Sequence, residues 1–185
     1  MNKAHYCAPA VAVATALVLL AGCSTGGTPA TTKLVGDVSE PYGYTSLSQL
    51  AGASPVIVVA RGGSEQKTVP ADAEAKSGLD ATVTQMRVVQ TLKGKLSAGD
   101  SFDLWQTGTH DGAPQEIVQD GQDYLLYLQP FSFLSGPVAN TWVTTSLSGA
   151  YKASTSGEYS MLGNVGQASI LPAEVTQKQA RDELS

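Results

Sequence analysis

Residues 80–92 read DATVTQMRVVQTL, a run in which β-branched and apolar side chains are interspersed with polar ones. This pattern is typical of a β-strand that buries one face. Thr84, Met86 and Val88 fall on one face of such a strand, whereas Val83 and Val89 fall on the other. We therefore expect a long strand that contains a bend or a β-bulge.

Further strands are expected on both sides of this segment. Residues 55–62 (PVIVVARG) are a β-branched run typical of a buried strand, and residues 123–128 (DYLLYL) have apolar side chains on both faces. Shorter strand patterns lie at residues 101–107, 141–146, 150–153 and 158–162. Because turn signals separate these strands at intervals of roughly ten residues, the sequence predicts a small β-barrel or sandwich.

Two helices and one long loop complete the expected fold. Residues 46–54 (SLSQLAGAS) have a capping-box pattern, with Ser46 followed three residues later by Gln49, and predict a short N-terminal helix. Residues 172–185 (PAEVTQKQARDELS) predict a C-terminal helix. Residues 64–78 are charged, rich in alanine and interrupted by proline, so we expect an exposed loop there.

The N-terminal residues have the order of a secretory leader. Lys3 precedes the uncharged run APAVAVATALVLL at residues 8–20, which is shorter than the about 20 residues that span a bilayer but long enough for a signal-peptide core. The sequence LAGC at residues 20–23 then resembles the lipobox of bacterial lipoproteins, in which a diacylglycerol is attached to the cysteine thiol and cleavage occurs just before it. An ordinary secretory signal that contains a cysteine is the alternative.

The lipobox resemblance implies a signal peptide at residues 1–22 and a lipid-anchored, extracytoplasmic protein at the cell membrane or outer membrane. Residues 23–45 are rich in Gly, Ser, Thr and Pro, which predicts a flexible tether, and the folded domain is expected from residue 46 to 185. Cys7 would leave with the leader and Cys23 would carry the lipid. The mature chain would then have no free thiol, no disulfide and no thiolate metal site.

The order of the predicted segments also resembles that of a group of bacterial extracytoplasmic proteins with small OB-like barrels, related in fold to tissue inhibitors of metalloproteinases. The resemblance covers about residues 46–161, and its most specific parts are VVQTLKG (88–94) and GQDYLLYL (121–128). It implies a mainly β fold, a small OB-like β-barrel with a short N-terminal and a C-terminal helix. Metalloproteinase inhibition is not implied, because Cys23 would be lipidated and has no partner cysteine.

Signals for catalysis are weak. His110, the one histidine outside the leader, lies beside Asp111 in TGTHDGAP, but adjacent side chains rarely face each other and no Gly-x-Ser-x-Gly motif supplies a nucleophile. An envelope hydrolase that uses His110 with nearby carboxylates is the alternative function. The competing interpretation of this segment is a solvated loop with an Asp-Gly turn.

Composition excludes other classes of ligand. One histidine without a thiol is too few for a protein-only zinc site, and the aspartates do not form an EF-hand pattern, so we expect no metal and no cofactor. The formal net charge of −5 at pH 7 disfavours binding to nucleic acid.

Aromatic residues offer the remaining candidate site. OB-like barrels bind ligands on one strand face, so aromatic side chains either grip a ligand there or fill the barrel. The residues concerned are Trp105, Trp142, Phe131, Phe133, Tyr124 and Tyr127. The apolar loop QPFSFLSGPV favours Phe131, Phe133 and Leu134 as a contact patch for a partner. We therefore expect a non-enzymatic binding or accessory module for an unidentified envelope protein or glycan.

Overall fold

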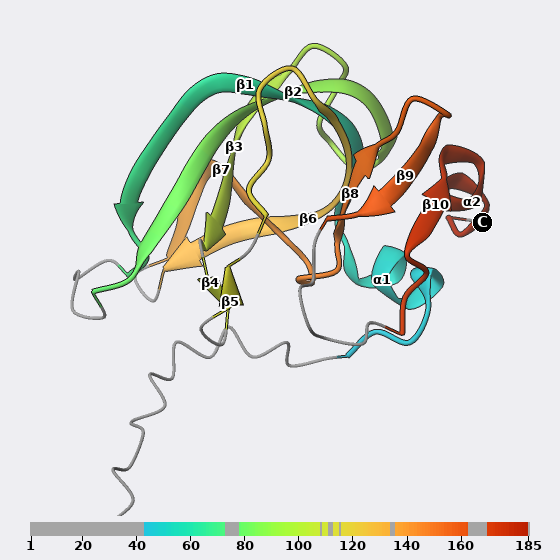
Figure 1. The fold of residues 1–185 in the computed structure, drawn as a ribbon, viewed down its shortest axis with the longest axis horizontal. Helices are drawn as coiled ribbons and strands as arrows, with labels where there is room; N and C mark the ends of the chain where they lie inside the picture. The colour runs from blue at the N-terminus through green and yellow to red at the C-terminus, as the bar shows by residue number, and fades with distance from the viewer. Residues whose placement is uncertain are drawn as a thin grey trace, which may run out of the picture. The chain divides into compact units, whose positions relative to one another are not determined.

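The structure is a computed structural model that describes residues 43–72, 78–107, 116–133, 136–162 and 170–184, together with the backbone of residues 109–110 and 113–114. The elements in chain order are α1 (Leu47–Ala53), β1 (Val56–Pro70), β2 (Asp80–Lys93), β3 (Ser101–Thr107), β4 (Thr109–His110), β5 (Ala113–Pro114), β6 (Asp123–Phe133), β7 (Gly136–Thr144), β8 (Ala150–Ala153), β9 (Glu158–Met161), β10 (Glu174–Thr176) and α2 (Gln177–Asp182) (Figure 1). The predicted mainly β fold with a short helix near each end of the described domain is confirmed.

Five strands form a ring. β1 pairs with β2, β2 with β3, β3 with β7 and β7 with β6, and β6 pairs back with β1. Strand directions cannot alternate all the way round a ring of five, so one neighbouring pair has to be parallel. That pair is β3–β7, which is joined through Asp103↔Thr141 and Leu104↔Trp142. The predicted OB-like barrel is therefore present as a ring with one short parallel seam.

β6 also carries the rest of the sheet. One of its edges pairs with Val56–Arg61 of β1, while the first half of its other edge pairs with β8 and the second half pairs with β7. β8 continues the sheet through β9 to β10, which leads directly into α2 (Figure 1). The strands β8–β10 thus form an extension of the barrel wall.

The alternating side chains of β6 enter two different hydrophobic clusters. Tyr124, Leu126 and Leu128 belong to the interior cluster of the barrel, together with side chains from β1, β2, β3 and β7. Leu125 and Tyr127 point to the opposite face, where they pack with apolar side chains of α1, β10 and α2. Both helices are therefore held against the outside of the barrel wall.

The helix ends follow the sequence signals in part. The Ser46 side chain accepts a hydrogen bond from the Gln49 amide at 3.2 Å, as the predicted capping box requires. The Gln49 side chain accepts from the amide of Thr45 and not from that of Ser46. At the C-terminus the complete capping box lies at Thr176 and Gln179. None of the described helices is long and apolar enough to span a membrane.

Three sequence predictions were wrong in extent. The segment QPFSFLSGPV was expected to be an apolar loop, but residues 129–133 complete β6 and residues 136–138 begin β7, paired through Ser132↔Pro137 and Phe133↔Gly136. Residues 64–70 belong to β1 and pair with β2 as far as Pro70↔Asp80, although residues 64–78 were expected to be a loop. Their side chains are mostly exposed, so this part of the strand lacks the apolar alternation that would have identified it. The C-terminal helix begins at Gln177, because Glu174–Thr176 pair with β9 as a strand.

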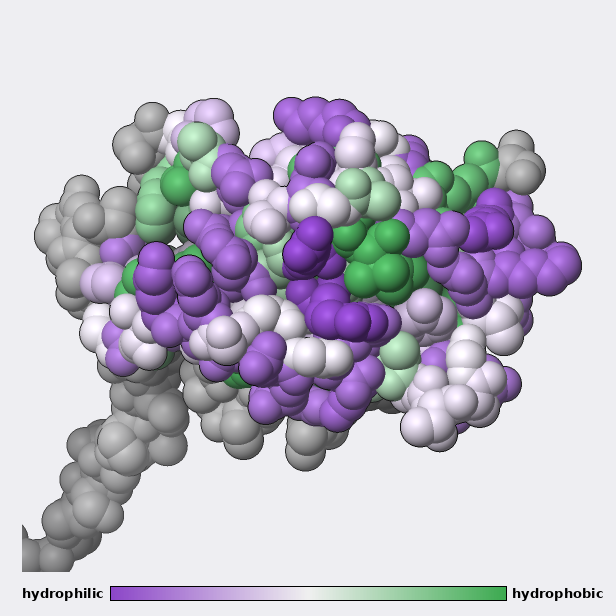
Figure 2. All heavy atoms as spheres, turned by 90° about the horizontal axis from the view of Figure 1, so that it is seen from above, coloured by the Kyte–Doolittle hydropathy of each residue, from purple (hydrophilic) through white to green (hydrophobic). Residues whose placement is uncertain are grey.

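The predicted irregularity of the long strand is confirmed. The β1–β2 register shifts at three places, between Ile57 and Val58, between Val59 and Ala60, and between Gly62 and Gln66. Seen from above, across the arch of β1 and β2, the surface is mostly hydrophilic and its hydrophobic atoms form small groups (Figure 2). The exposed polar run of residues 64–68 in β1 accords with this view.

Candidate functional site

The interior of the barrel is a filled core. Val118 is fully buried in the interior cluster, although it lies in the segment between β5 and β6. Gln106 Oε1 accepts from the Val118 amide at 3.2 Å, and Gln66 Nε2 donates to the Val118 carbonyl at 2.9 Å. The two glutamines therefore hold the backbone of this segment from both sides.

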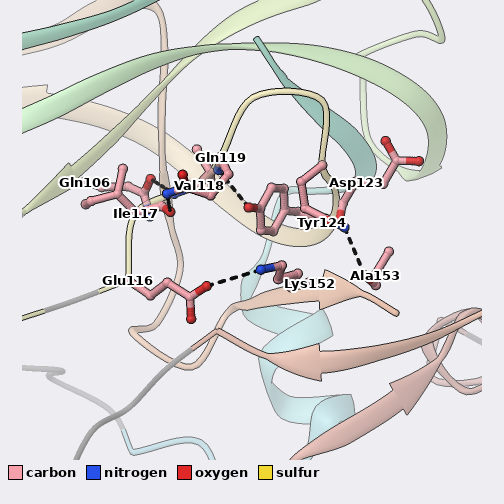
Figure 3. Close-up of polar contacts among 10 residues, drawn as sticks. Gln106, Glu116, Ile117, Val118, Gln119, Asp123, Tyr124, Lys152 and Ala153 are labelled. Atoms are coloured by element: carbon pink, nitrogen blue, oxygen red, sulfur yellow. Dashed lines mark hydrogen bonds and ion pairs between the residues drawn. The ribbon is translucent and has the colours of Figure 1, made fainter. Parts of the chain in front are cut away.

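A tyrosine completes this attachment from within the barrel. The hydroxyl of Tyr124 accepts a hydrogen bond from the Gln119 amide at 2.7 Å, and Glu116 lies 3.6 Å from Lys152 (Figure 3). Burial raises the pKa of Tyr124, while the bond from Gln119 acts in the opposite direction. Because this segment packs into the interior cluster, the outer wall is the candidate binding surface.

The outer wall carries a separate hydrophobic cluster, here called the outer aromatic cluster. Its buried members are Trp105 of β3, Phe131 of β6 and Ala81 of β2. Its partly buried members form a rim around them: Val69, Ala71, Val83, Phe133, Val138 and Val143. Since Leu104 points into the barrel, the alternation of β3 turns Trp105 outward.

The aromatic rings of this cluster are in direct contact. Trp105 and Phe131 are stacked, with their ring centroids 4.5 Å apart and their planes at 19°. Phe133 meets Phe131 edge to face, at a centroid distance of 4.8 Å and an angle of 79°. Both are geometries that aromatic pairs prefer. Trp105 is 7% exposed and Phe131 9%, so these two rings form the floor of the cluster, whereas Phe133 belongs to the rim.

Trp105 has an unsatisfied donor. Its indole Nε1 is buried and has no hydrogen-bond partner within the part of the chain that the structure describes. Tryptophan has this one polar group, and it usually finds an acceptor when it is buried. An unpaired donor therefore lies within a cluster that is otherwise apolar.

The other predicted residues are distributed as follows. Cys23, Leu134 and Asp111 lie outside the described residues, and His110 is described only by its backbone, in the pairing of β4 with β5. Trp142 and Tyr124 belong to the interior cluster, whereas Tyr127 packs on the outer wall against the helices. The structure brings Phe131 and Phe133 together with Trp105. The alternation of β3 indicated that Trp105 and Leu104 face opposite ways, but not which of them faces outward.

Charged side chains of the described residues form surface pairs. Arg61 binds Asp123 through two hydrogen bonds of 2.6 and 2.9 Å, which raises the pKa of Arg61. Lys178 pairs with Asp182 within α2, and the ammonium group of Lys95 lies 5.7 Å from the ring centroid of Trp142. Among the described residues no group of three or more His, Cys, Asp or Glu could hold a metal ion.

No protein-family model matches the chain, and no curated protein matches it either.

Proposed function

We propose that this protein is a lipid-anchored, extracytoplasmic binding or accessory module, without catalysis of its own, which contacts another envelope component through the outer aromatic cluster. The observation that carries the proposal is the partly exposed apolar rim around the stacked pair of Trp105 and Phe131 on the outer wall. Trp105 and Phe131 are already buried, so the part of the cluster that a partner can reach is its partly exposed rim, which includes Phe133. Interface centres are likewise poor in charge and rich in aromatic residues.

The lipobox sequence LAGC at residues 20–23 supports the anchor. A single acyl chain binds a protein to a membrane only marginally, whereas two or more acyl chains bind it firmly. A diacylglycerol on Cys23 has two acyl chains and would therefore retain the protein at a membrane surface. The Gly-, Ser-, Thr- and Pro-rich residues 23–45 would separate that anchor from the barrel. The barrel would then meet its partner close to the membrane.

The cluster favours a protein partner over a glycan. Sugars bind flat against an exposed aromatic face, but Phe131 covers one face of Trp105, and Trp105 is 7% exposed. The rim instead offers mainly aliphatic side chains, among them Val83, Val138 and Val143. Such a surface suits apolar side chains of another protein.

The experiment is crosslinking in intact envelopes with the lipidated chain, followed by affinity capture and identification of the partner by mass spectrometry. Phe133→Ser tests the rim, because Phe133 is partly exposed and its replacement spares the buried floor. Val89→Ser is the matched control, since Val89 is an apolar residue of β2 that is 45% exposed and lies outside the cluster.

The proposal expects one partner to be captured by the wild type and by Val89→Ser but not by Phe133→Ser. The purified partner should then bind the wild type and Val89→Ser with similar affinity and Phe133→Ser more weakly. Equal capture by all three chains contradicts the proposed surface. A captured adduct that loses its extra mass on digestion of the cell-wall glycan, and that contains no peptide of another protein, identifies a glycan partner instead.

A further inference from the structure

β1 has a free edge beyond the point at which it leaves β6. Val56–Arg61 pair with β2 on one edge and with β6 on the other, and the pairing with β6 ends at Arg61↔Asp123. Gln66–Pro70 continue to pair with β2, but no strand in the described ranges of the chain pairs with their other edge. In Figure 1, β1 accordingly forms the outer boundary of the arch in this region.

The register determines which backbone groups face this edge. The Ala71 amide donates to the Leu79 carbonyl at 2.8 Å, and the register is uninterrupted from there back to Gln66. In an antiparallel ladder the backbone groups of every second residue point to the partner strand, and those of the residues between them point away. The backbone groups of Lys67 therefore point to β2, whereas those of Thr68 face the free edge.

The free edge is short. Thr68 offers both an N–H and a C=O there, whereas Pro70 offers a C=O alone, because proline has no N–H. A proline is tolerated at this position because the N–H that it lacks would not have bonded β2. At the other end Gln66 donates to the Val118 carbonyl at 2.9 Å, so the segment before β6 lies beside it. The accessible edge is thus Lys67–Pro70.

The side chains along this edge border the outer aromatic cluster. Val69 belongs to the rim of that cluster and pairs with Ala81, which is a buried member. Lys67 pairs with the rim residue Val83 and therefore lies on the same face of the sheet. Lys67 is exposed, and its ammonium group makes no ion pair or hydrogen bond with the residues that the structure describes. The edge thus presents an apolar and a cationic side chain on the outer face.

We propose that an extended segment of the partner protein adds to β1 as a further strand along Lys67–Pro70, with an acidic side chain beside Lys67 and an apolar side chain beside Val69. The inference rests on the proposed function, since it assigns the binding mode of that same partner. Backbone hydrogen bonds to Thr68 would supply affinity, and the alternate side chains would supply specificity. Opposite charges stabilise neighbouring strands, and the strand period places the two partner side chains two residues apart.

Charge favours such a segment over a second copy of this chain. Antiparallel pairing of two copies about Thr68 would place their Lys67 side chains diagonally across the new strand pair, where like charges repel. Each Pro70 would also leave one carbonyl of the other copy without a donor. An acidic segment avoids both costs. Glu65 lies in the irregular part of β1, so the acidic side chain is expected beside Lys67 and not further along the strand.

The test selects random linear peptides, displayed on phage, on the full chain in detergent micelles. The wild type should enrich peptides in which Asp or Glu lies two residues from an apolar residue. Lys67→Glu should enrich Lys or Arg at that position instead. Arg87→Glu is the matched control, because Arg87 is an exposed cation of β2 that lies away from the edge, and it should enrich the same peptides as the wild type.

Thr68→Pro tests the backbone contact directly. It removes the N–H that faces the free edge but no hydrogen bond to β2, so the barrel should stay folded. The selected peptides should bind this variant about tenfold more weakly than the wild type, measured by fluorescence anisotropy. In the wild type, peptide binding should slow amide hydrogen exchange at Thr68 and leave that of Lys67, which already faces β2, unchanged.

Selection of no peptide by the wild type, or equal binding to wild type, Lys67→Glu and Thr68→Pro, overturns the strand addition. So does a dimer of this chain that Thr68→Pro dissociates, because the second copy would then occupy the edge. Phe133→Ser distinguishes this failure from that of the proposed function. If the captured partner still loses affinity for Phe133→Ser while Lys67→Glu and Thr68→Pro bind it normally, the outer aromatic cluster stands and only the binding mode is wrong.

Discussion

Trp105 and Phe131 stack ring on ring, although the strands that carry them, β3 and β6, do not pair with each other. Both strands pair with β7, so the contact reaches across the outer face of that strand. The aromatic pair therefore supplements the short parallel seam between β3 and β7 with side-chain packing. This arrangement makes the stability of the barrel depend on residues outside its core.

We expect Phe131→Ala to lower the free energy of unfolding by about 3 kcal/mol, because it leaves a cavity against Trp105. Phe133→Ala should cost about 1 kcal/mol, since Phe133 lies at the rim and is only partly buried. Urea unfolding followed by tryptophan fluorescence measures both. Equal losses for the two variants would show that Phe131 is not an anchor of the cluster.

Gly62 should tolerate no side chain. A Cβ at this position would overlap the carbonyl oxygen of Gln119, in the segment that closes the barrel around Val118. Gly62 also donates to Gln122 and accepts from Gly121 through its backbone, at 2.9 Å each. We expect Gly62→Ala to lower the free energy of unfolding by about 2 kcal/mol or more.

The control for this change is Gly52→Ala in α1, where a new Cβ meets nothing within 4 Å. It should raise the free energy of unfolding by about 0.5–1 kcal/mol, because alanine is the better helix former. Urea unfolding and amide hydrogen exchange of residues 117–122 compare the two variants. If the exchange of this segment is unchanged in Gly62→Ala, the close approach does not hold the segment in place.

The chain should lose stability at alkaline pH. Burial raises the pKa of Tyr127 to about 12 and raises that of Tyr151 as well, whereas an unfolded tyrosine titrates near pH 10. Above about pH 10 the unfolded chain therefore releases protons that the folded chain still holds, and the free energy of unfolding falls. The slope is about 1.4 kcal/mol per pH unit for each such tyrosine.

Urea titrations between pH 9 and about pH 12, with tyrosinate absorbance recorded in parallel, measure this loss. Phenolate absorbance from the buried tyrosines should appear together with unfolding. The double variant Tyr127→Phe/Tyr151→Phe should show a flatter pH dependence than the wild type. A wild type whose stability is constant to about pH 12 would contradict the burial of these hydroxyls.

Cys23→Ser tests whether a lipid on this residue anchors the protein to a membrane. It should move the chain from the detergent phase to the aqueous phase, because serine cannot carry the thioether-linked lipid that supplies the membrane affinity. Intact-mass measurement should find acyl chains on the wild type and none on the variant. A wild-type chain that is cleaved but carries no lipid would favour the ordinary secretory signal.

The sequence predicted the strands in which side chains alternate between two faces and the helix that begins at a capping residue. The pattern of residues 123–128 identified both faces of β6, and the Ser46 signal placed the start of α1. The polar half of β1 was not predicted, because its side chains are mostly exposed. Such a strand does not need the alternation of apolar and polar residues by which strands are identified in a sequence. The complete capping box at Thr176 and Gln179 was a readable signal for the true start of α2.

The candidate site was accessible to sequence analysis only in part. The sequence predicted a contact patch of Phe131, Phe133 and Leu134 in an apolar loop. In the structure Phe131 and Phe133 lie in β6, Phe131 is buried, and Trp105 is their neighbour. Strand alternation separates two faces but does not say which one lies inside a ring, so Trp142 and Trp105 were indistinguishable. Their assignment depends on strand pairings between residues far apart in the chain, such as Leu104↔Trp142.

β6 joins two hydrophobic clusters through successive side chains, with Tyr124 and Leu126 in one and Leu125 and Tyr127 in the other. Neither cluster can open without withdrawing this strand from its neighbour. We therefore expect the barrel and its C-terminal extension to unfold in a single cooperative step. Truncation after β7 would not release a minimal barrel; it would uncover the apolar outer face of β6 and turn the domain into an aggregating fragment.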